Sequence, residues 1–363
     1  MSFAVKIKKI RKHLFLSFTL LLIFLIGLNV LSKKNSKDNS SGVILDSQSE
    51  MTDLNEDSPV QEEDVLSAEV LGEDKGIEKS QIRFGVVVND YSNKTGEISG
   101  LENILGTTVS TVGIYKQFGL PTNQYLIEDD LAYIKKTGKT LLLTWEPWNP
   151  NEGTSQSIDY LKEITEGKHD AYLTAFAQQV KNFANPVFLR FAHEMNGNWY
   201  PWGNRPSEYI SAYRYLVDIF RREGITNVKF VWSINHESVP YEPINQTTKY
   251  FPGEAYVDMV GLDGYNFGTS RAGSTWRNFY EIFSPAYSFV SGVYPNKPII
   301  IAEVASTEIG GNKTNWINDM FISLSKMPKI REIIWFSLLK ETDWRIDSSP
   351  SSSEAFKSNL STL

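Results

Sequence analysis

Short apolar, β-branched runs recur from residue 81 onward and alternate with longer amphipathic stretches. The runs expected to form strands are residues 82–88, 108–114, 140–145, 187–191, 228–233, 258–262, 298–302 and 331–336. Helices are expected between them, for example at 171–183, 206–222, 274–290 and 315–325. Ile299-Ile300-Ile301-Ala302 is apolar throughout, which is typical of a strand buried on both faces. This alternation predicts an α/β fold, a closed (β/α)8 TIM barrel over residues 81–363.

An open, doubly wound sheet is the alternative architecture for such an alternation. That fold usually carries a glycine-rich phosphate loop directly after its first strand. The segment at this place, Val88-Asn89-Asp90-Tyr91, contains no glycine, and this favours the barrel.

Residues 1–34 combine a basic segment with an apolar run of 18 residues from Leu14 to Leu31. The run is longer than the apolar core of a usual signal peptide and just long enough to span a bilayer. Lys33 and Lys34 follow it in place of a small-residue cleavage site. We therefore expect an uncleaved signal anchor with its N-terminus inside the cell, and a cleaved signal peptide is the alternative.

Residues 35–80 are rich in Ser, Asp, Glu and Asn. Such a segment cannot bury enough apolar area to offset the entropy of ordering it, so we expect a disordered acidic linker. Together with the anchor, it would hold the barrel outside the cell at the membrane surface. Cleavage of the signal segment would instead release a secreted protein.

Composition narrows the class of partner. Aromatic residues make up 13% of the chain and include nine Trp, and flat aromatic rings suit the apolar faces of sugars. The net charge of −7 does not suit a phosphate backbone, so no nucleic acid is expected. The chain has no Cys, which excludes disulfides and thiolate metal sites. We expect a monomer that binds a polysaccharide.

Carboxylates, amides and aromatic residues gather where the expected strands end, which in a (β/α)8 barrel is the face that carries the active site. Cleavage of a glycosidic bond needs two carboxyl groups, one protonated and one ionised. Glu194 after the fourth strand and Glu303 after the seventh are the candidates. Glu146 and Asp263, at the ends of the third and sixth strands, are rival carboxylates.

Strand alternation predicts the direction of both candidate side chains. It places Glu194 on the same face as Arg190, and Glu303 on the same face as Ile301. Strands four and seven lie nearly opposite in such a barrel, so the carboxyl groups are expected to face each other across its mouth. A separation of about 5–5.5 Å would suit a retaining mechanism, and about 6.5–9.5 Å an inverting one.

A zinc site is a further interpretation, because His193-Glu194 and His236-Glu237 begin like the motif H-E-x-x-H. Gly197 and Pro240 stand where the second His is required. We therefore expect no metal and no cofactor, and we expect His193 to be a hydrogen-bonding neighbour of the site.

The segment after the fourth strand resembles the acid/base signature of glycoside hydrolase family 26. Its sequence is Arg190-Phe191-Ala192-His193-Glu194-Met195-Asn196-Gly197-Asn198-Trp199-Tyr200-Pro201-Trp202-Gly203. Three later segments resemble the family's sixth, seventh and eighth strand ends: Val260-Gly261-Leu262-Asp263-Gly264-Tyr265-Asn266, Ile300-Ile301-Ala302-Glu303-Val304-Ala305-Ser306, and Ile334-Trp335-Phe336 with the stretch that follows it. The resemblance covers about residues 81–350.

The resemblance implies a (β/α)8 barrel that retains anomeric configuration and needs no cofactor. It makes Glu194 the acid/base and Glu303 the nucleophile, with Tyr265 hydrogen-bonded to the nucleophile. The supporting and substrate-binding residues that we expect are His193, Arg190, Trp145, Asn196, Trp199, Trp202 and Trp335, the last as the platform for the sugar that is attacked.

The substrates of the resembling family include β-1,4-mannan, mixed-linkage β-1,3-1,4-glucan and β-1,3-xylan. Many of its mannanases have an aromatic residue where Pro201 stands, and the Trp-Tyr-Pro-Trp form is closer to the β-glucanase members. We expect an endo-acting, retaining glycoside hydrolase on β-glucan or β-mannan. A non-catalytic, surface-tethered carbohydrate-binding barrel is the alternative, since the Trp residues would serve it equally.

Overall fold

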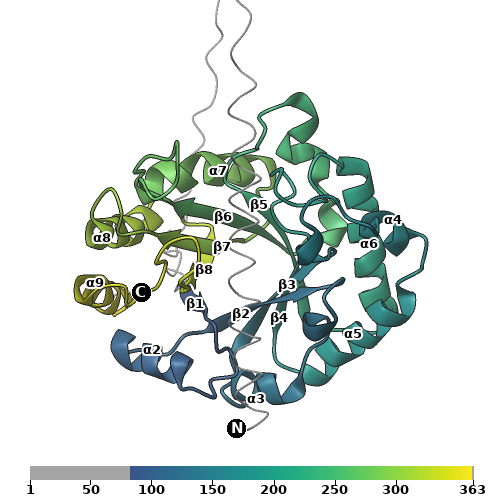
Figure 1. Ribbon diagram of the computed structural model, residues 1–363, viewed down its shortest axis with the longest axis horizontal. Helices are drawn as coiled ribbons and strands as arrows, with labels where there is room; N and C mark the ends of the chain where they lie inside the picture. The colour runs from purple at the N-terminus through teal and green to yellow at the C-terminus, as the bar shows by residue number, and fades with distance from the viewer. Residues whose placement is uncertain (1–81, 362–363) are drawn as a thin grey trace, which may run out of the picture. The chain divides into compact units, whose positions relative to one another are not determined.

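The computed structural model describes residues 82–361 (Figure 1). The predicted anchor and acidic linker lie outside the described residues. Between residues 82 and 361, no helix combines the length and the apolar character needed to cross a bilayer.

Eight parallel strands close into a barrel in chain order, with β8 paired to β1. The strands are β1 Arg83–Val87, β2 Thr111–Gln117, β3 Thr140–Glu146, β4 Val187–Phe191, β5 Val228–Asn235, β6 Met259–Asn266, β7 Ile299–Ser306 and β8 Ile330–Phe336. Each of them overlaps one of the strands expected from the sequence. The predicted (β/α)8 barrel is therefore confirmed.

The helices form a ring around the strands (Figure 1). They are α2 Glu97–Leu105, α3 Glu128–Lys136, α4 Tyr160–Thr165, α5 Asp170–Phe183, α6 Pro206–Arg222, α7 Phe279–Val293, α8 Lys313–Leu324 and α9 Pro350–Leu360. The connection from β5 to β6 contains three short 3-10 helices, Pro243–Asn245, Thr247–Tyr250 and Glu254–Tyr256. Two more 3-10 helices, Pro121–Asn123 and Pro150–Glu152, follow β2 and β3.

Helix α7 begins later than the sequence pattern predicted. The expected helix started at residue 274, but the helix begins at Phe279 because Asn278 caps it. The Asn278 side chain accepts a hydrogen bond from the backbone N–H of Glu281, and the Glu281 carboxylate accepts one from the backbone N–H of Asn278. This reciprocal capping fixes the start of the helix.

The two faces of each strand meet different surroundings. Trp145 of β3 points outward and stacks on Phe176 of α5, with ring centroids 4.0 Å apart. Its neighbour Thr144 points inward and accepts hydrogen bonds from the guanidinium of Arg190 inside the barrel. The barrel interior therefore carries a buried polar layer below the C-terminal ends of the strands.

Candidate active site

Glu303, on β7, lies among donors that stabilise its charged form. Its Oε1 accepts hydrogen bonds from the Tyr115 hydroxyl at 2.5 Å and from Arg190, and its Oε2 accepts one from the Tyr265 hydroxyl. Burial alone would raise the pKa of Glu303, but Arg190 and the two hydroxyls lower that pKa to about 2. Glu303 is therefore a carboxylate at neutral pH.

Glu194, in the loop after β4, lies in surroundings that favour its protonated form. It is 8% exposed, and Trp199 donates an indole N–H to its Oε2 at 2.6 Å. Burial raises the pKa of Glu194 well above its ordinary value, and the negative charges of Asp263 and Glu303 raise it further. Glu194 therefore holds its proton where Glu303 does not.

The protonation states of the two carboxyl groups are linked, since the charge of Glu303 acts on Glu194. A pair of acids whose pKa values are driven apart by their surroundings is the arrangement that assigns a general acid and a nucleophile or base. The structure thus brings Glu194 and Glu303 into one buried site at the C-terminal ends of β4 and β7.

The backbone reaches this arrangement in a different way from simple strand alternation. Strand β4 ends at Phe191, and Ala192 and Glu194 then adopt left-handed backbone conformations with φ of 46° and 52°. The pairing of β6 with β7 shifts register between Ile301 and Glu303. Both side chains lie in the mouth of the barrel as expected, but a turn after β4 and a register shift in β7 set their directions, in place of regular strand alternation.

Arg190 connects the buried polar layer to Glu303. It is fully buried, and it donates hydrogen bonds to Asp263 Oδ1 at 2.9 Å and to Thr144 as well as to Glu303. Asp263 also accepts a hydrogen bond from the Ser233 hydroxyl at 2.8 Å. Both oxygens of Asp263 are therefore engaged inside the barrel, and this rival carboxylate supports Arg190.

The pKa of Asp263 is shifted in the opposite direction to that of Glu303. Burial raises the pKa of Asp263 to about 7 although Arg190 opposes that rise. The guanidinium of Arg190 contacts both carboxyl groups and lowers the pKa of each.

His193 is buried beside the nucleophile candidate. Its Nε2 lies 3.7 Å from Glu303 Oε1 and 3.1 Å from the Tyr200 hydroxyl. Burial and the charge of Arg190 lower the pKa of His193 well below its ordinary value, so the ring is neutral. Its Nδ1 is buried and has no hydrogen-bond partner in the part of the chain that the structure describes.

Three of the tryptophans expected to bind substrate are fully buried. Trp145 packs outward against α5, as described above. Trp202 stacks against Tyr200 with ring centroids 4.4 Å apart, and donates its N–H to the His193 carbonyl at 2.7 Å. Trp335 packs against Phe356 of α9 at 4.7 Å. None of the three offers an exposed face to a sugar, whereas Trp199 is half-buried beside Glu194.

Asn196 is also buried, and its amide is used within the protein. Its Oδ1 accepts a hydrogen bond from the backbone N–H of Asn235 at 2.9 Å, and its Nδ2 donates to the Asn235 carbonyl at 2.8 Å. These bonds tie the loop of Glu194 to the end of β5. Asn196 therefore positions the acid loop, and its placement does not support the substrate contact expected from the sequence.

Sequence reasoning missed several aromatic side chains around Glu303. Phe336 of β8 lies edge-on to Tyr115 and Tyr265, with ring centroids 6.3 Å and 5.7 Å apart. Trp344 lies against Tyr265 at 5.2 Å. The signal for Phe336 was its place directly after Trp335, because consecutive strand residues point to opposite faces.

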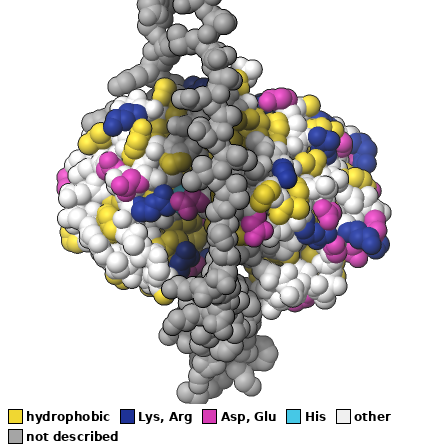
Figure 2. All heavy atoms as spheres, turned by 90° about the horizontal axis from the view of Figure 1, so that it is seen from above, with side chains coloured by type: hydrophobic (Ala, Val, Ile, Leu, Met, Phe, Trp, Pro, Cys, Tyr) yellow, Lys and Arg dark blue, Asp and Glu magenta, His cyan; other side chains and the backbone are white. Residues whose placement is uncertain are grey.

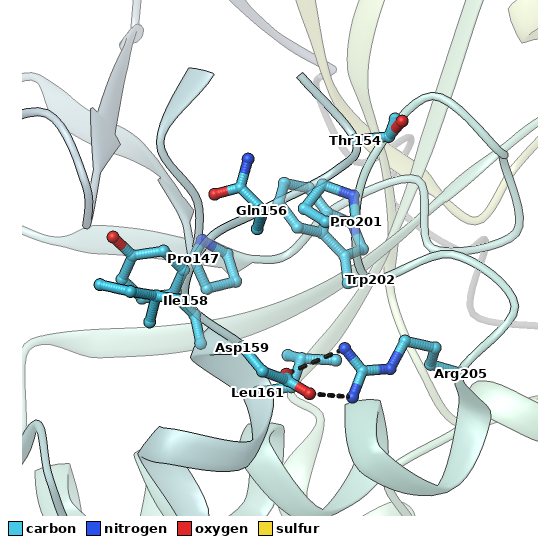
Figure 3. Close-up of a pocket in the computed structure, with 10 residues that line it drawn as sticks. Pro147, Thr154, Gln156, Ile158, Asp159, Leu161, Pro201, Trp202 and Arg205 are labelled. Atoms are coloured by element: carbon cyan, nitrogen blue, oxygen red, sulfur yellow. Dashed lines mark hydrogen bonds and ion pairs between the residues drawn. The ribbon is translucent and has the colours of Figure 1, made fainter. Parts of the chain in front are cut away.

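A cavity of about 230 Å3 lies outside this site, between the loops that follow β3 and β4 (Figure 3). Pro147, Pro201 and Trp202 line it, and Arg205 closes one side with two hydrogen bonds to Asp159, at 2.9 Å and 2.7 Å. The two charged side chains of its lining, Arg205 and Asp159, are therefore paired with each other. This cavity contains neither catalytic candidate.

The described part of the face shown in Figure 2 does not have one dominant charge. On the face shown in Figure 2, basic and acidic side chains are interspersed. Between residues 82 and 361, no group of three His, Asp or Glu residues is placed to hold a metal ion.

Comparison with known proteins places this geometry in a family. The model of glycosyl hydrolase family 26 matches residues 139–316, which include both Glu194 and Glu303. Endoglucanase H of Acetivibrio thermocellus is 43% identical over 236 residues, covering 62% of this chain and 24% of that protein. A mannan endo-1,4-beta-mannosidase of Bacillus subtilis is 30% identical over 190 residues, covering 47% of this chain and 44% of that protein.

Solved structures share the fold. A family 26 beta-mannanase from Bacteroides ovatus superposes with a TM-score of 0.59 at 18% identity, covering 77% of this chain and 88% of that one. The Bacillus subtilis mannanase BCman gives 0.52 at 22% identity, with 75% and 83% covered. At these identities the likeness establishes the architecture alone. The chain spans between about a quarter and less than half of the length of the curated relatives named above.

Proposed function

Because this chain belongs to glycosyl hydrolase family 26, we propose that it hydrolyses a β-linked polysaccharide at internal bonds, with retention of anomeric configuration. The observation that carries the proposal is the pair Glu194 and Glu303, two buried carboxyl groups in one site with pKa values shifted in opposite directions. Sugar binding alone does not require such a pair.

The proposed reaction has two steps. Glu194 donates its proton to the glycosidic oxygen while the Glu303 carboxylate attacks the anomeric carbon, so the C–O bond to the leaving sugar breaks and a glycosyl ester forms. A water then attacks the same carbon, Glu194 takes the water proton, and Glu303 is released as a carboxylate. Two inversions give a product of the original configuration.

The surroundings of Glu303 suit the nucleophile role. Arg190, Tyr115 and Tyr265 hold its two oxygens in a fixed orientation. A carboxylate fixed in this way needs little reorganisation when it attacks. The neutral His193 adds no proton that could compete with the one on Glu194.

Mixed-linkage β-1,3-1,4-glucan is the favoured substrate, and β-1,4-mannan is the alternative. Two points support the glucan: the family resemblance puts Pro201 where many mannanases have an aromatic residue, and the relative at 43% identity is an endoglucanase. The mannanase relatives are 23–35% identical.

We also propose that residues 1–34 anchor the enzyme to the membrane, with the barrel outside the cell. The anchored enzyme is proposed to be a monomer. Protease treatment of intact cells tests this, since an exposed barrel is digested and an internal one is protected. Release of the full activity into the medium would instead support cleavage of the signal segment.

A reducing-sugar assay on lichenan, glucomannan and galactomannan tests the proposed function. The wild-type protein is expected to hydrolyse at least one of them, and Glu303→Ala is expected to lose several orders of magnitude in turnover while its circular dichroism stays unchanged. Proton NMR of the first products should show the β-anomer. Normal hydrolysis by Glu303→Ala would refute the assignment.

A carbohydrate-binding barrel without activity is the competing function. It predicts that the wild-type protein binds one of these polysaccharides but releases no reducing ends. Binding of equal strength by wild-type and Glu303→Ala proteins, with no hydrolysis by either, would favour that reading.

A further inference from the structure

A third carboxyl group lies at the mouth of the barrel, and the two-step reaction does not use it. Glu146 ends β3 and is 4% exposed. Its Oε2 accepts hydrogen bonds from Gln117 Nε2 at 2.5 Å and from Trp148 Nε1 at 3.3 Å. Its Oε1 accepts no hydrogen bond from residues 82–361, and it is not among their fully enclosed polar atoms. This oxygen is therefore free to accept a hydrogen bond from a ligand group.

The strand direction places this side chain on the inner face of the barrel. Thr144, two residues earlier, binds Arg190 inside the barrel, while Trp145 between them packs outward on α5. Residues two apart in a strand share a face. Glu146 therefore lies one layer above Thr144, at the open end.

The contacts of Glu146 place it on the nucleophile side of the site. Gln117 shares the inner face of β2 with Tyr115, which donates to Glu303 Oε1. Trp148 is connected to the same oxygen, Oε1 of Glu303, through Tyr200 and His193.

Trp148 lies edge-on to Tyr200 with ring centroids 5.2 Å apart. The Tyr200 hydroxyl lies 3.1 Å from His193 Nε2, and His193 in turn lies 3.7 Å from Glu303 Oε1. The acid donates to the leaving oxygen, so the leaving part of the substrate lies beside Glu194. Because the charge of Glu303 acts on Glu146, we expect the retained sugars to extend on the side of Glu146.

We propose that Glu146 accepts a hydrogen bond from a hydroxyl of the retained sugar next to the one that is attacked, and so determines substrate specificity. The inference rests on the proposed function and assigns a residue to it. A carboxylate only accepts hydrogen bonds, so it selects for a hydroxyl in one position. A site built in this way discriminates strongly against a sugar that lacks the hydroxyl.

Lys340, in the loop after β8, supplies a positive charge near this position. Its ammonium lies 5.7 Å from the centroid of the Phe336 ring and 3.1 Å from Glu341. Burial raises the pKa of Glu146, and Gln117, Trp148 and the charge of Lys340 oppose the rise. The lysine therefore favours the charged, accepting form of Glu146.

Activated aryl β-glycosides of one and of two sugars, built from the sugar that the polysaccharide assay identifies, test the proposal. The one-sugar compound fills only the attacked position, and the two-sugar compound also reaches Glu146. We expect Glu146→Gln to lower kcat/KM for the two-sugar glycoside by about 10- to 100-fold, the effect of one charge-assisted hydrogen bond. The rate on the one-sugar glycoside should change by less than about 2-fold, because this compound does not reach Glu146.

Glu332→Gln is the matched control, because Glu332 is also a buried carboxyl but lies at the other end of the barrel, hydrogen-bonded to Ser110 and Thr111. It should leave the ratio of the two rates as in the wild type. An equal loss on both glycosides in Glu146→Gln, or no loss on either, would overturn the proposal. If the wild-type protein cleaves neither compound and no polysaccharide, the proposed function itself fails.

Discussion

Trp199 donates its indole N–H to Oε2 of Glu194 at 2.6 Å, and within residues 82–361 this is the one hydrogen bond that the carboxyl group receives. An indole nitrogen can only donate, so Oε2 must accept. The carbonyl oxygen of a protonated carboxyl group is the better acceptor, so this bond favours the tautomer with the proton on Oε1. Trp199 thus favours Oε1 as the proton-donating oxygen of Glu194.

Trp199→Phe should shift the alkaline limb of the pH–rate profile to higher pH. The indole N–H stabilises the carboxylate and so lowers the pKa of Glu194, against burial, which raises it. Removing the donor raises this pKa, and Glu194 stays protonated to higher pH. The profile of kcat/KM against pH checks this. A limb that stays in place or moves to lower pH would show that the bond does not tune the acid.

Gly197→Ala should lower activity by displacing the Trp199 ring. A Cβ at Gly197 would overlap the six-membered ring of Trp199, which packs directly on the glycine. We expect kcat to fall by about 10-fold or more, because a small displacement of an acid is costly to catalysis. Kinetics together with thermal unfolding measure this.

Gly100→Ala is the control for that variant, since Gly100 lies in α2 with no atom within 4 Å of an added Cβ. Alanine in a helix is favoured over glycine, so this variant should gain about 0.5–1 kcal/mol in stability. Its activity should equal that of the wild type. Equal kinetics in Gly197→Ala would mean that the ring need not rest on the glycine.

The sequence predicted the barrel well because its strands are short apolar runs, whose number and spacing allow few other folds. It also singled out Glu194 and Glu303, from the aromatic residues near the first and the resemblance around both, and the structure brings these two side chains into one buried site. The turn and the register shift that set their directions could not be predicted. Left-handed conformations at Ala192 and Glu194, which are not glycine, leave no mark in the residue pattern.

The tryptophans show a second limit of sequence reasoning. Alternation states that Trp335 and Phe336 point to opposite faces, but either ring suits a sugar platform. Phe356 of α9 decides the question by packing against Trp335. Such a contact joins segments far apart in the sequence, so no local pattern reveals it.

Glu194→Gln should stabilise the protein at neutral pH. The folded protein holds the Glu194 proton above the ordinary pKa of 4.5, at which the unfolded chain releases it. Between 4.5 and the raised pKa the folded state binds more protons, so stability falls as pH rises. Glutamine has no charge to bury, and its oxygen can still accept from Trp199.

We expect the melting temperature of this variant at pH 7 to exceed that of the wild type by about 2–4 °C, equivalent to about 1 kcal/mol. The difference should shrink as pH falls toward 4.5. A constant difference across pH, or a lower melting temperature at pH 7, would contradict a raised pKa at Glu194.

Phe336→Ala and Trp335→Phe should separate substrate contact from packing. Phe336 lies between Tyr115 and Tyr265, the two hydroxyl donors of Glu303, so its loss should lower kcat/KM by about 10-fold or more. Trp335 lies outside the barrel wall and donates to the Trp344 carbonyl at 2.7 Å. Trp335→Phe leaves a cavity and an unpaired carbonyl, which should cost about 1–3 kcal/mol.

Steady-state kinetics on the polysaccharide and thermal unfolding of both variants check this separation. KM for Trp335→Phe should match that of the wild type, because the ring has no exposed face for a sugar. If instead Trp335→Phe raises KM while its stability is unchanged, Trp335 is the sugar platform that the family resemblance implied. In that case Trp335, and not Phe336, must point toward the inside of the barrel from the eighth strand.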